Sequence, residues 1–116
     1  MQDFRNLKVW QKAHELTLLI YKLTFDFPRE ELFGLRNSLR KTCVDIPAFI
    51  AEGCGKPTDA EFSKSLYAAL GFVGRLEYYT LLAFELGMFS EADYKAVNEE
   101  ILEVKRMLHG FNQRLR

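Results

Sequence analysis

Residues that could perform chemistry are few and widely spaced in this 116-residue chain. Neither histidine, His14 or His109, completes the Glu-x-x-His spacing with which helical bundles hold a pair of metal ions. Cys43 and Cys54 have no histidine at a telling distance and no CxxC spacing, which favours reduced thiols over a disulfide. The chain also lacks a GxSxG elbow, a P-loop and a GxGxxG motif. We therefore expect a protein that is not an enzyme and that holds no metal or cofactor.

One carboxylate lies where it needs a partner. Glu77 falls beside the main apolar stripe of a predicted helix, and Arg36 and Arg40 border the stripe of the preceding one. A carboxylate that is removed from water is stable only when it is paired. We expect Glu77 to pair with Arg36 or Arg40, and a structural ion pair is favoured over a catalytic role.

Basic residues form two groups that are candidates for binding RNA or DNA. The candidates are Arg36, Arg40 and Lys41, and then Lys105, Arg106, Arg114 and Arg116. Sixteen basic residues balance sixteen acidic ones, so overall charge does not drive binding to a polyanion. Cations near the end of a helix also complement its dipole, and this explanation stays open. An oligomer would repeat either group and add weak contacts together.

Four segments with helical periodicity carry these residues. The first runs from about residue 6 to 25, and the second from near Pro28 to Gly53. The third opens at Thr58 with a capping-box pattern and ends at Gly87, and the fourth runs from Ser90 to the C-terminus. No segment alternates like a strand. Short loops between long helices predict one all-α domain over residues 1–116, an up-down-up-down antiparallel four-helix bundle.

The second helix contains the stretch DIPAFIAEG, residues 45–53, in which Pro47 should interrupt the helix. Its apolar stripe keeps its phase through the proline: Leu32, Leu35, Leu39, Cys43, Ile46 and Ile50. This pattern predicts one continuous helix, kinked at Pro47. The kink either serves packing alone, or the freed carbonyl of Cys43 and the nearby Glu52 form a polar site.

Two helices carry more apolar surface than a lone bundle can bury. The third has a second apolar stripe at Tyr67, Gly74, Tyr78 and Leu81, and the first is also apolar on two sides. Surplus faces of this kind predict a homo-oligomer. No apolar run reaches the roughly 18 residues that a membrane span needs, and the N-terminus shows no signal peptide. We expect a soluble cytoplasmic protein.

Several stretches resemble the family of bacterial 23S rRNA intervening-sequence proteins. They are FRNLKVWQKA (4–13), Tyr21, Phe27-Pro28, Glu31, Gly34-Leu35, Leu39-Arg40-Lys41, Ile46-Pro47-Ala48, Ile50-Ala51-Glu52-Gly53, Glu61-Phe62, Ala69, Gly71 and Leu76-Glu77. The resemblance implies a four-helix protomer and a ring-shaped homopentamer. It also implies a link to RNA, since related retroelement accessory proteins bind nucleic acid and a reverse transcriptase. No enzymatic activity is implied.

The chain departs from the family pattern at five positions. Ser38 stands in place of glutamine, Asp45 and Phe49 in place of serine and asparagine, Phe72 in place of serine, and Arg75 in place of an acid. We expect Phe49 and Phe72 to fill the altered space by apolar packing. The sequence thus predicts a non-enzymatic oligomeric scaffold or adaptor that associates with RNA, DNA or a nucleic-acid enzyme. The alternative is a structural or protein-binding homo-oligomer with no nucleic-acid role.

Overall fold

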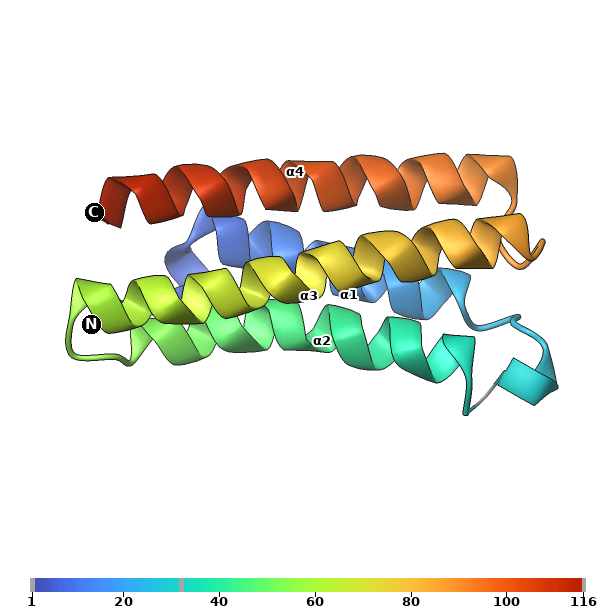
Figure 1. Cartoon of the computed structure of the whole chain (residues 1–116), viewed down its shortest axis with the longest axis horizontal. Coiled ribbons are helices and arrows are strands. Elements are labelled where there is room, and N and C mark those ends of the chain that lie inside the picture. The colour runs from blue at the N-terminus through green and yellow to red at the C-terminus, as the bar shows by residue number, and fades with distance from the viewer. Residues whose placement is uncertain (1, 32, 116) are drawn as a thin grey trace.

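Four long helices make up most of the protein. The computed structural model describes residues 2–31 and 33–115. The helices are α1 (Lys8–Leu23), α2 (Leu35–Cys54), α3 (Asp59–Glu85) and α4 (Glu91–Leu115), with short 3-10 turns η1 (Phe4–Asn6) and η2 (Arg29–Glu31). Each helix runs antiparallel to the one before it (Figure 1). The predicted all-α, up-down-up-down bundle is confirmed.

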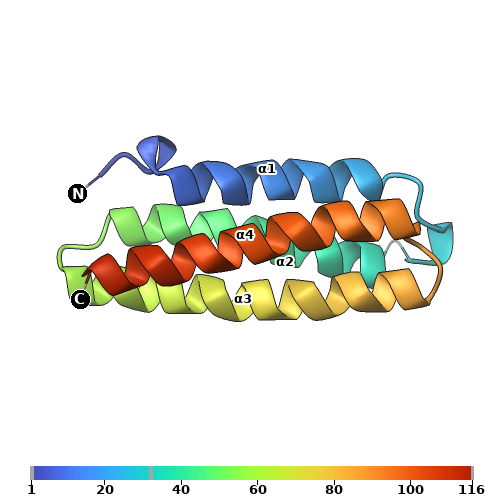
Figure 2. The same ribbon diagram turned by 90° about the horizontal axis from the view of Figure 1, so that it is seen from above.

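The helices occupy the corners of a square. α1 packs against α2 and α4, and α3 packs against the same two helices. Within the described residues no Cα atom of α1 comes within 8 Å of one of α3, so these helices lie at opposite corners, with α2 and α4 between them (Figure 2). An outward face of α1 and an outward face of α3 therefore point in opposite directions.

One apolar stripe from each helix fills the centre of the bundle. α4 contributes the stripe that its periodicity predicts, with Val97, Ile101, Val104 and Leu108 fully buried. α1 contributes the side that contains Val9, Ala13, Leu16 and Ile20 rather than the side with Leu18 and Tyr21. Burial of these side chains supplies the main stabilisation of the fold.

Local capping groups define the ends of α3 and the start of α4. The Thr58 hydroxyl accepts a hydrogen bond from the Glu61 amide at 3.2 Å, and Ser90 does the same for Asp93 at 3.1 Å. Gly87 adopts a φ of 80°, which allows its amide to reach the Phe84 carbonyl and the next amide to reach that of Ala83. This pattern is a Schellman motif, and it confirms the predicted glycine stop.

The predicted start of the second helix was wrong. α2 begins at Leu35, and Arg29–Glu31 forms the separate turn η2. The Glu31 carboxylate accepts a hydrogen bond from the Leu35 amide at 2.8 Å, so this acid caps α2 from outside. Leu32, the first member of the predicted stripe, lies outside the described residues.

α2 continues without interruption through Pro47, as the stripe predicts. Proline offers no N–H to the carbonyl four residues earlier, that of Cys43. The Thr17 hydroxyl of α1 lies 3.1 Å from this carbonyl oxygen and 2.9 Å from that of Ala13, so its single proton is shared between the two acceptors. Glu52 is exposed, and the Cys43 carbonyl is not available for a polar site shared with it. The kink itself stays a prediction.

Candidate nucleic-acid interface and exposed faces

The two predicted basic groups lie at different ends of the bundle. Arg36, Arg40 and Lys41 are in the first turns of α2, whereas Arg106 and Arg114 are near the end of α4. α2 and α4 run in the same direction, so these ends are separated along the bundle, which is 43 Å long (Figure 1). Arg116 lies outside the described residues. The two groups cannot form one continuous patch on a single chain.

Arg40 is partly buried and bonds to the end of α1. Its Nε donates to the Thr24 hydroxyl at 2.9 Å, and its Nη2 donates to the Tyr21 carbonyl at 3.0 Å. The guanidinium also lies 4.5 Å from the centre of the Tyr21 ring. Burial, followed by the neighbouring Arg36 charge, lowers the pKa of Arg40. Arg40 therefore ties α2 to the end of α1, and of its group Lys41 is the exposed cation.

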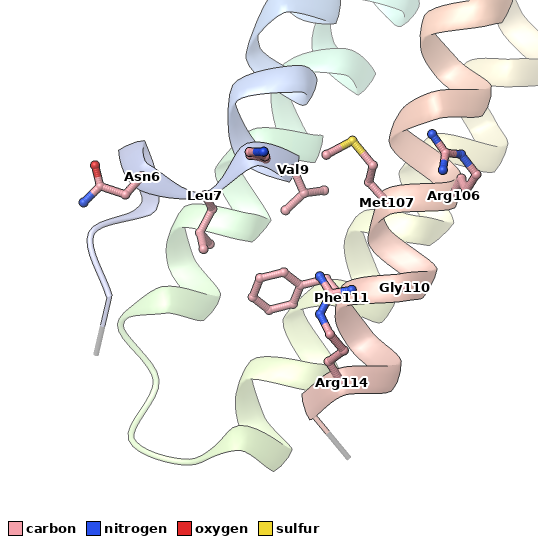
Figure 3. A pocket seen from close by; sticks show the side chains of 9 residues that line it. Asn6, Leu7, Val9, Arg106, Met107, Gly110, Phe111 and Arg114 are labelled. Atoms are coloured by element: carbon pink, nitrogen blue, oxygen red, sulfur yellow. The ribbon is translucent and has the colours of Figure 1, made fainter.

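Two residues of the second group border a hollow between α1 and α4, which we call the α1–α4 groove. It has a volume of about 450 Å³ and is lined by Asn6, Leu7, Lys8, Val9, Arg106, Met107, Gly110, Phe111 and Arg114. Figure 3 shows Leu7, Val9, Met107 and Phe111 directed into the space between α1 and α4, with both arginines on the α4 side. Cations thus surround an apolar floor.

The charges around this groove are only partly available. Arg106 forms an ion pair with Glu103 of its own helix, and this hydrogen bond lowers the pKa of Glu103. Leu7 offers no side-chain cap, so the first backbone N–H groups of α1 add positive potential at the same edge. Lys8 was missed from the sequence, although the start of the first helix must meet the end of the fourth in an antiparallel bundle.

Glu77 does not pair with Arg36 or Arg40, so that prediction was wrong. Its carboxylate forms an ion pair with Lys105 of α4 at 3.2 Å. Glu77 lies on the side of α3 that faces α4, whereas Arg40 lies on the side of α2 that faces α1. Lys105 is consequently engaged within the fold rather than in the α1–α4 groove.

The motif residues Glu52 and Gly53 differ in role. A Cβ atom at Gly53 would lie 2.7 Å from Cδ1 of Phe62 and 3.0 Å from Cβ of Ser65, so this glycine allows α2 and α3 to touch. Glu52 instead lines an open hollow between the same helices. Phe49 and Phe72 stack across these helices with ring centres 5.3 Å apart, which confirms their predicted apolar packing.

Both cysteines are buried and free. Burial raises the pKa of the Cys43 thiol from 9.0 to about 12 and also raises the pKa of Cys54. A neutral buried thiol is a poor nucleophile and a poor metal ligand. Among the described residues no group of three or more His, Cys, Asp and Glu side chains is placed to hold a metal ion. None of the described helices is long and apolar enough to cross a membrane.

Large apolar side chains remain exposed on the two diagonal helices. Leu18 on α1 keeps 58% of its surface exposed, Phe25 just after α1 keeps 73%, and Tyr78 on α3 keeps 58%. Leu81 is also exposed, and a Cβ atom at Gly74 would meet nothing within 4 Å. The second apolar sides predicted from the sequence therefore remain outside the core. They lie on helices at opposite corners of the bundle.

Comparison with known proteins supports the family and the fold. The family model described as 23S rRNA-intervening sequence protein matches residues 5–110. A crystal structure of a protein of unknown function from the S23 ribosomal protein family of Bacteroides thetaiotaomicron superposes with a TM-score of 0.82. That match has 20% sequence identity and covers 90% of this chain and 95% of the other. No protein with a curated description matches the sequence. With nearly its whole length matched, the chain belongs to the 23S rRNA-intervening sequence protein family.

Proposed function

We propose that the protein is a non-enzymatic cytoplasmic scaffold whose subunits assemble head to tail into a ring. The observation that carries this proposal is the pair of exposed apolar faces on α1 and α3. Because these helices occupy opposite corners, one face on one copy meets the other face on the next copy. Such a contact is heterologous, and it makes a closed ring when the rotation between copies permits.

The family resemblance favours five copies in this ring. Native mass spectrometry of the untreated protein then gives a species at five times the chain mass of 13.5 kDa, or at a multiple of that mass when rings associate. Leu18→Lys on α1 and Leu81→Lys on α3 each place a charge in the contact and should each release monomers. The matched control Leu102→Lys on α4, which is also exposed, should leave the ring intact. A wild-type monomer would overturn the proposal.

The finer part of the proposal is that the ring binds RNA through its repeated α1–α4 grooves. Each groove offers Lys8, Arg106 and Arg114 around an apolar floor. Each groove alone binds RNA weakly, but the affinity rises when one RNA strand contacts more than one groove of the ring. Binding of this kind weakens steeply with salt because counterions are released.

A salt titration of binding to a single-stranded RNA tests this part. We expect Arg106→Ala with Arg114→Ala to reduce the slope of log affinity against log salt by about two. The control double variant Arg29→Ala with Lys95→Ala removes two exposed cations elsewhere and should leave the slope unchanged. Binding that is absent even at low salt favours the second candidate, a protein-binding or structural ring. The engagement of Arg106 by Glu103 is the observation in favour of that candidate.

A further inference from the structure

A second surface lies apart from the α1–α4 groove, on the outer side of α2 and α3. Three adjoining hollows of about 300, 220 and 170 Å³ follow one another along these two helices. Phe49 and Glu52 line two of them, and Ala68 connects to the third. The stacked rings of Phe49 and Phe72 form their apolar floor. We call this surface the α2–α3 groove.

The two walls of the α2–α3 groove carry opposite charges. Asp45 and Glu52 stand on α2, and Lys64 and Arg75 stand on α3. At the end nearest the α2–α3 loop the order reverses, with Lys56 on the α2 side and Glu61 on α3. None of these six side chains forms an ion pair with another described residue. The Arg75 guanidinium lies 5.1 Å from the centre of the Phe72 ring, and Glu61 accepts a hydrogen bond from the Thr58 hydroxyl. The groove therefore combines an apolar floor with charges that form no ion pair within the described chain.

Opposite charges occur at matching levels along the groove. The stacked rings of Phe49 and Phe72 lie at the same height along the bundle axis, and we call residues at the same height level with each other. Because α2 and α3 are antiparallel, a residue four positions before Phe49 is level with one about four positions after Phe72. This places Asp45 level with Arg75. Glu52 and Lys64 line the same hollow, as do Lys56 and Glu61. Asp45 thus has a base at its own level, and Glu52 and Glu61 each share a hollow with a base on the opposite wall.

We propose that the α2–α3 groove is the docking surface for a second copy of this chain, related by a two-fold axis parallel to the helices. Such an axis lays α2 of each copy over α3 of the other and keeps every residue at its level. Asp45 then faces Arg75 of the second copy, Glu52 faces Lys64, and Lys56 faces Glu61. The contact is isologous, so each of these pairs forms twice, and the two Phe49–Phe72 floors meet between them.

The alternative two-fold arrangement fits the charges less well. An axis across the groove lays α2 on α2 in antiparallel fashion and can bring Asp45 to Lys56. In that arrangement Glu52 meets Phe49, which leaves this charge against an aromatic ring. Complementary charges fix the register between surfaces more than they add affinity. The parallel axis is the arrangement in which all six charges meet their opposites.

This contact uses the side of α3 next to α2, whereas the head-to-tail contact uses Tyr78 and Leu81 on the neighbouring side of α3. When its axis is perpendicular to the axis of a closed ring, a two-fold contact joins two rings and doubles the number of subunits, so two rings of five chains give ten. Rings joined in this way contain an even number of chains. A chain that made only the α2–α3 contact would be a dimer.

Charge exchange at Glu52 and Lys64 tests the contact, because both side chains are exposed and neither forms an ion pair among the described residues. We expect Glu52→Lys and Lys64→Glu each to place like charges together and to weaken the two-fold contact at least about tenfold. The double variant restores opposite charges and should restore the contact. Native mass spectrometry and sedimentation velocity at low salt measure the stoichiometry, and circular dichroism checks that each variant is folded. The control Glu91→Lys reverses an exposed charge of α4 that is paired with Lys95, and it should change nothing.

The outcomes separate this contact from the ring. An even assembly that halves in each single variant and recovers in the double variant supports the groove. An odd ring unaffected by the variants leaves the ring standing and overturns the groove contact. A dimer that Glu52→Lys dissociates overturns the ring and supports the groove. Single variants that match the wild type, a double variant that fails to recover, or a wild-type monomer would each overturn the proposal made here.

Discussion

Replacing Thr17 with valine should destabilise the protein because it removes the donor that serves the Cys43 carbonyl. Pro47 leaves this carbonyl without its helical partner, and the Thr17 hydroxyl lies 3.1 Å from it in the core. An unsatisfied buried carbonyl costs about 1–3 kcal/mol. The variant should therefore lose that much free energy of unfolding and about 4 °C of Tm per kcal/mol. Urea unfolding at one fixed protein concentration measures it, since assembly makes stability depend on concentration.

The same substitution should cost less when Pro47 is replaced by alanine. Alanine restores a backbone N–H that reaches the Cys43 carbonyl in the ordinary helical way. Thr17→Val then leaves no unsatisfied group behind, so we expect a coupling energy of about 1–2 kcal/mol between the two changes. A double-mutant cycle isolates this coupling even though Pro47→Ala also alters packing.

A matched control is available at another buried threonine. The Thr80 hydroxyl is fully buried and has no hydrogen-bond partner in the described structure. Thr80→Val should therefore be neutral or stabilising, because valine removes a polar group that is buried at a cost. If the coupling between Thr17 and Pro47 falls below about 0.3 kcal/mol, or if both valine variants lose equal stability, the hydroxyl does not serve the freed carbonyl.

Three further predictions concern stability. Gly53→Ala should cost about 1 kcal/mol, because its methyl group would lie 2.7 Å from a buried ring; Gly110→Ala, whose methyl meets nothing nearer than 3.7 Å, should gain about 0.5–1 kcal/mol in the same urea assay. Equal gains in both variants would contradict the close approach at Gly53. Burial raises the pKa of the Cys43 thiol from 9.0 to about 12, so the folded state favours the neutral form. Its contribution is complete below pH 9 and is lost as the pH rises toward 12, and the stability difference from Cys43→Ala should shrink over that window rather than stay constant. Glu77→Gln should cost only about 0.2–1 kcal/mol, because its pair with Lys105 is partly exposed. That cost should fall further in about 1 M NaCl, and a loss that ignores salt would mean that Glu77 acts through packing.

The sequence predicted those parts of the fold that depend on neighbours along the chain. Thr58, Ser90 and Gly87 act through backbone groups three to five residues away, so their patterns indicate helix ends directly. The predicted start of α2 was wrong for a related reason. An acid after a proline suits the first turn of a helix, but Glu31 uses its carboxylate to cap a helix that begins four residues later. The same residue types satisfy either arrangement.

Partners across helices could not be predicted in this way. Periodicity places Glu77 on one side of its own helix, but it does not tell which neighbouring helix lies on that side. The choice between Arg40 and Lys105 depends on the order of helices around the bundle. That order is set only when the apolar stripes of all four helices pack together. Thr17 was missed for the same reason, since nothing near it in sequence indicates that it meets the carbonyl freed by Pro47.

The balance of charge on this chain has a different meaning for folding and for association. Of the ion pairs among described residues, those of Arg5, Lys95 and Arg106 join residues within four positions of each other, and only Lys105 connects two helices. Exposed pairs of this kind contribute little to stability, so the apolar core holds the bundle together. The charges around the α2–α3 groove form no ion pair with another described residue. Charges that a fold does not need can still decide which surface meets which, because a wrong register places like charges together and a correct one pairs them. A neutral chain with opposite charges at matching levels is for this reason better suited to recognising another copy of itself than a uniformly charged one.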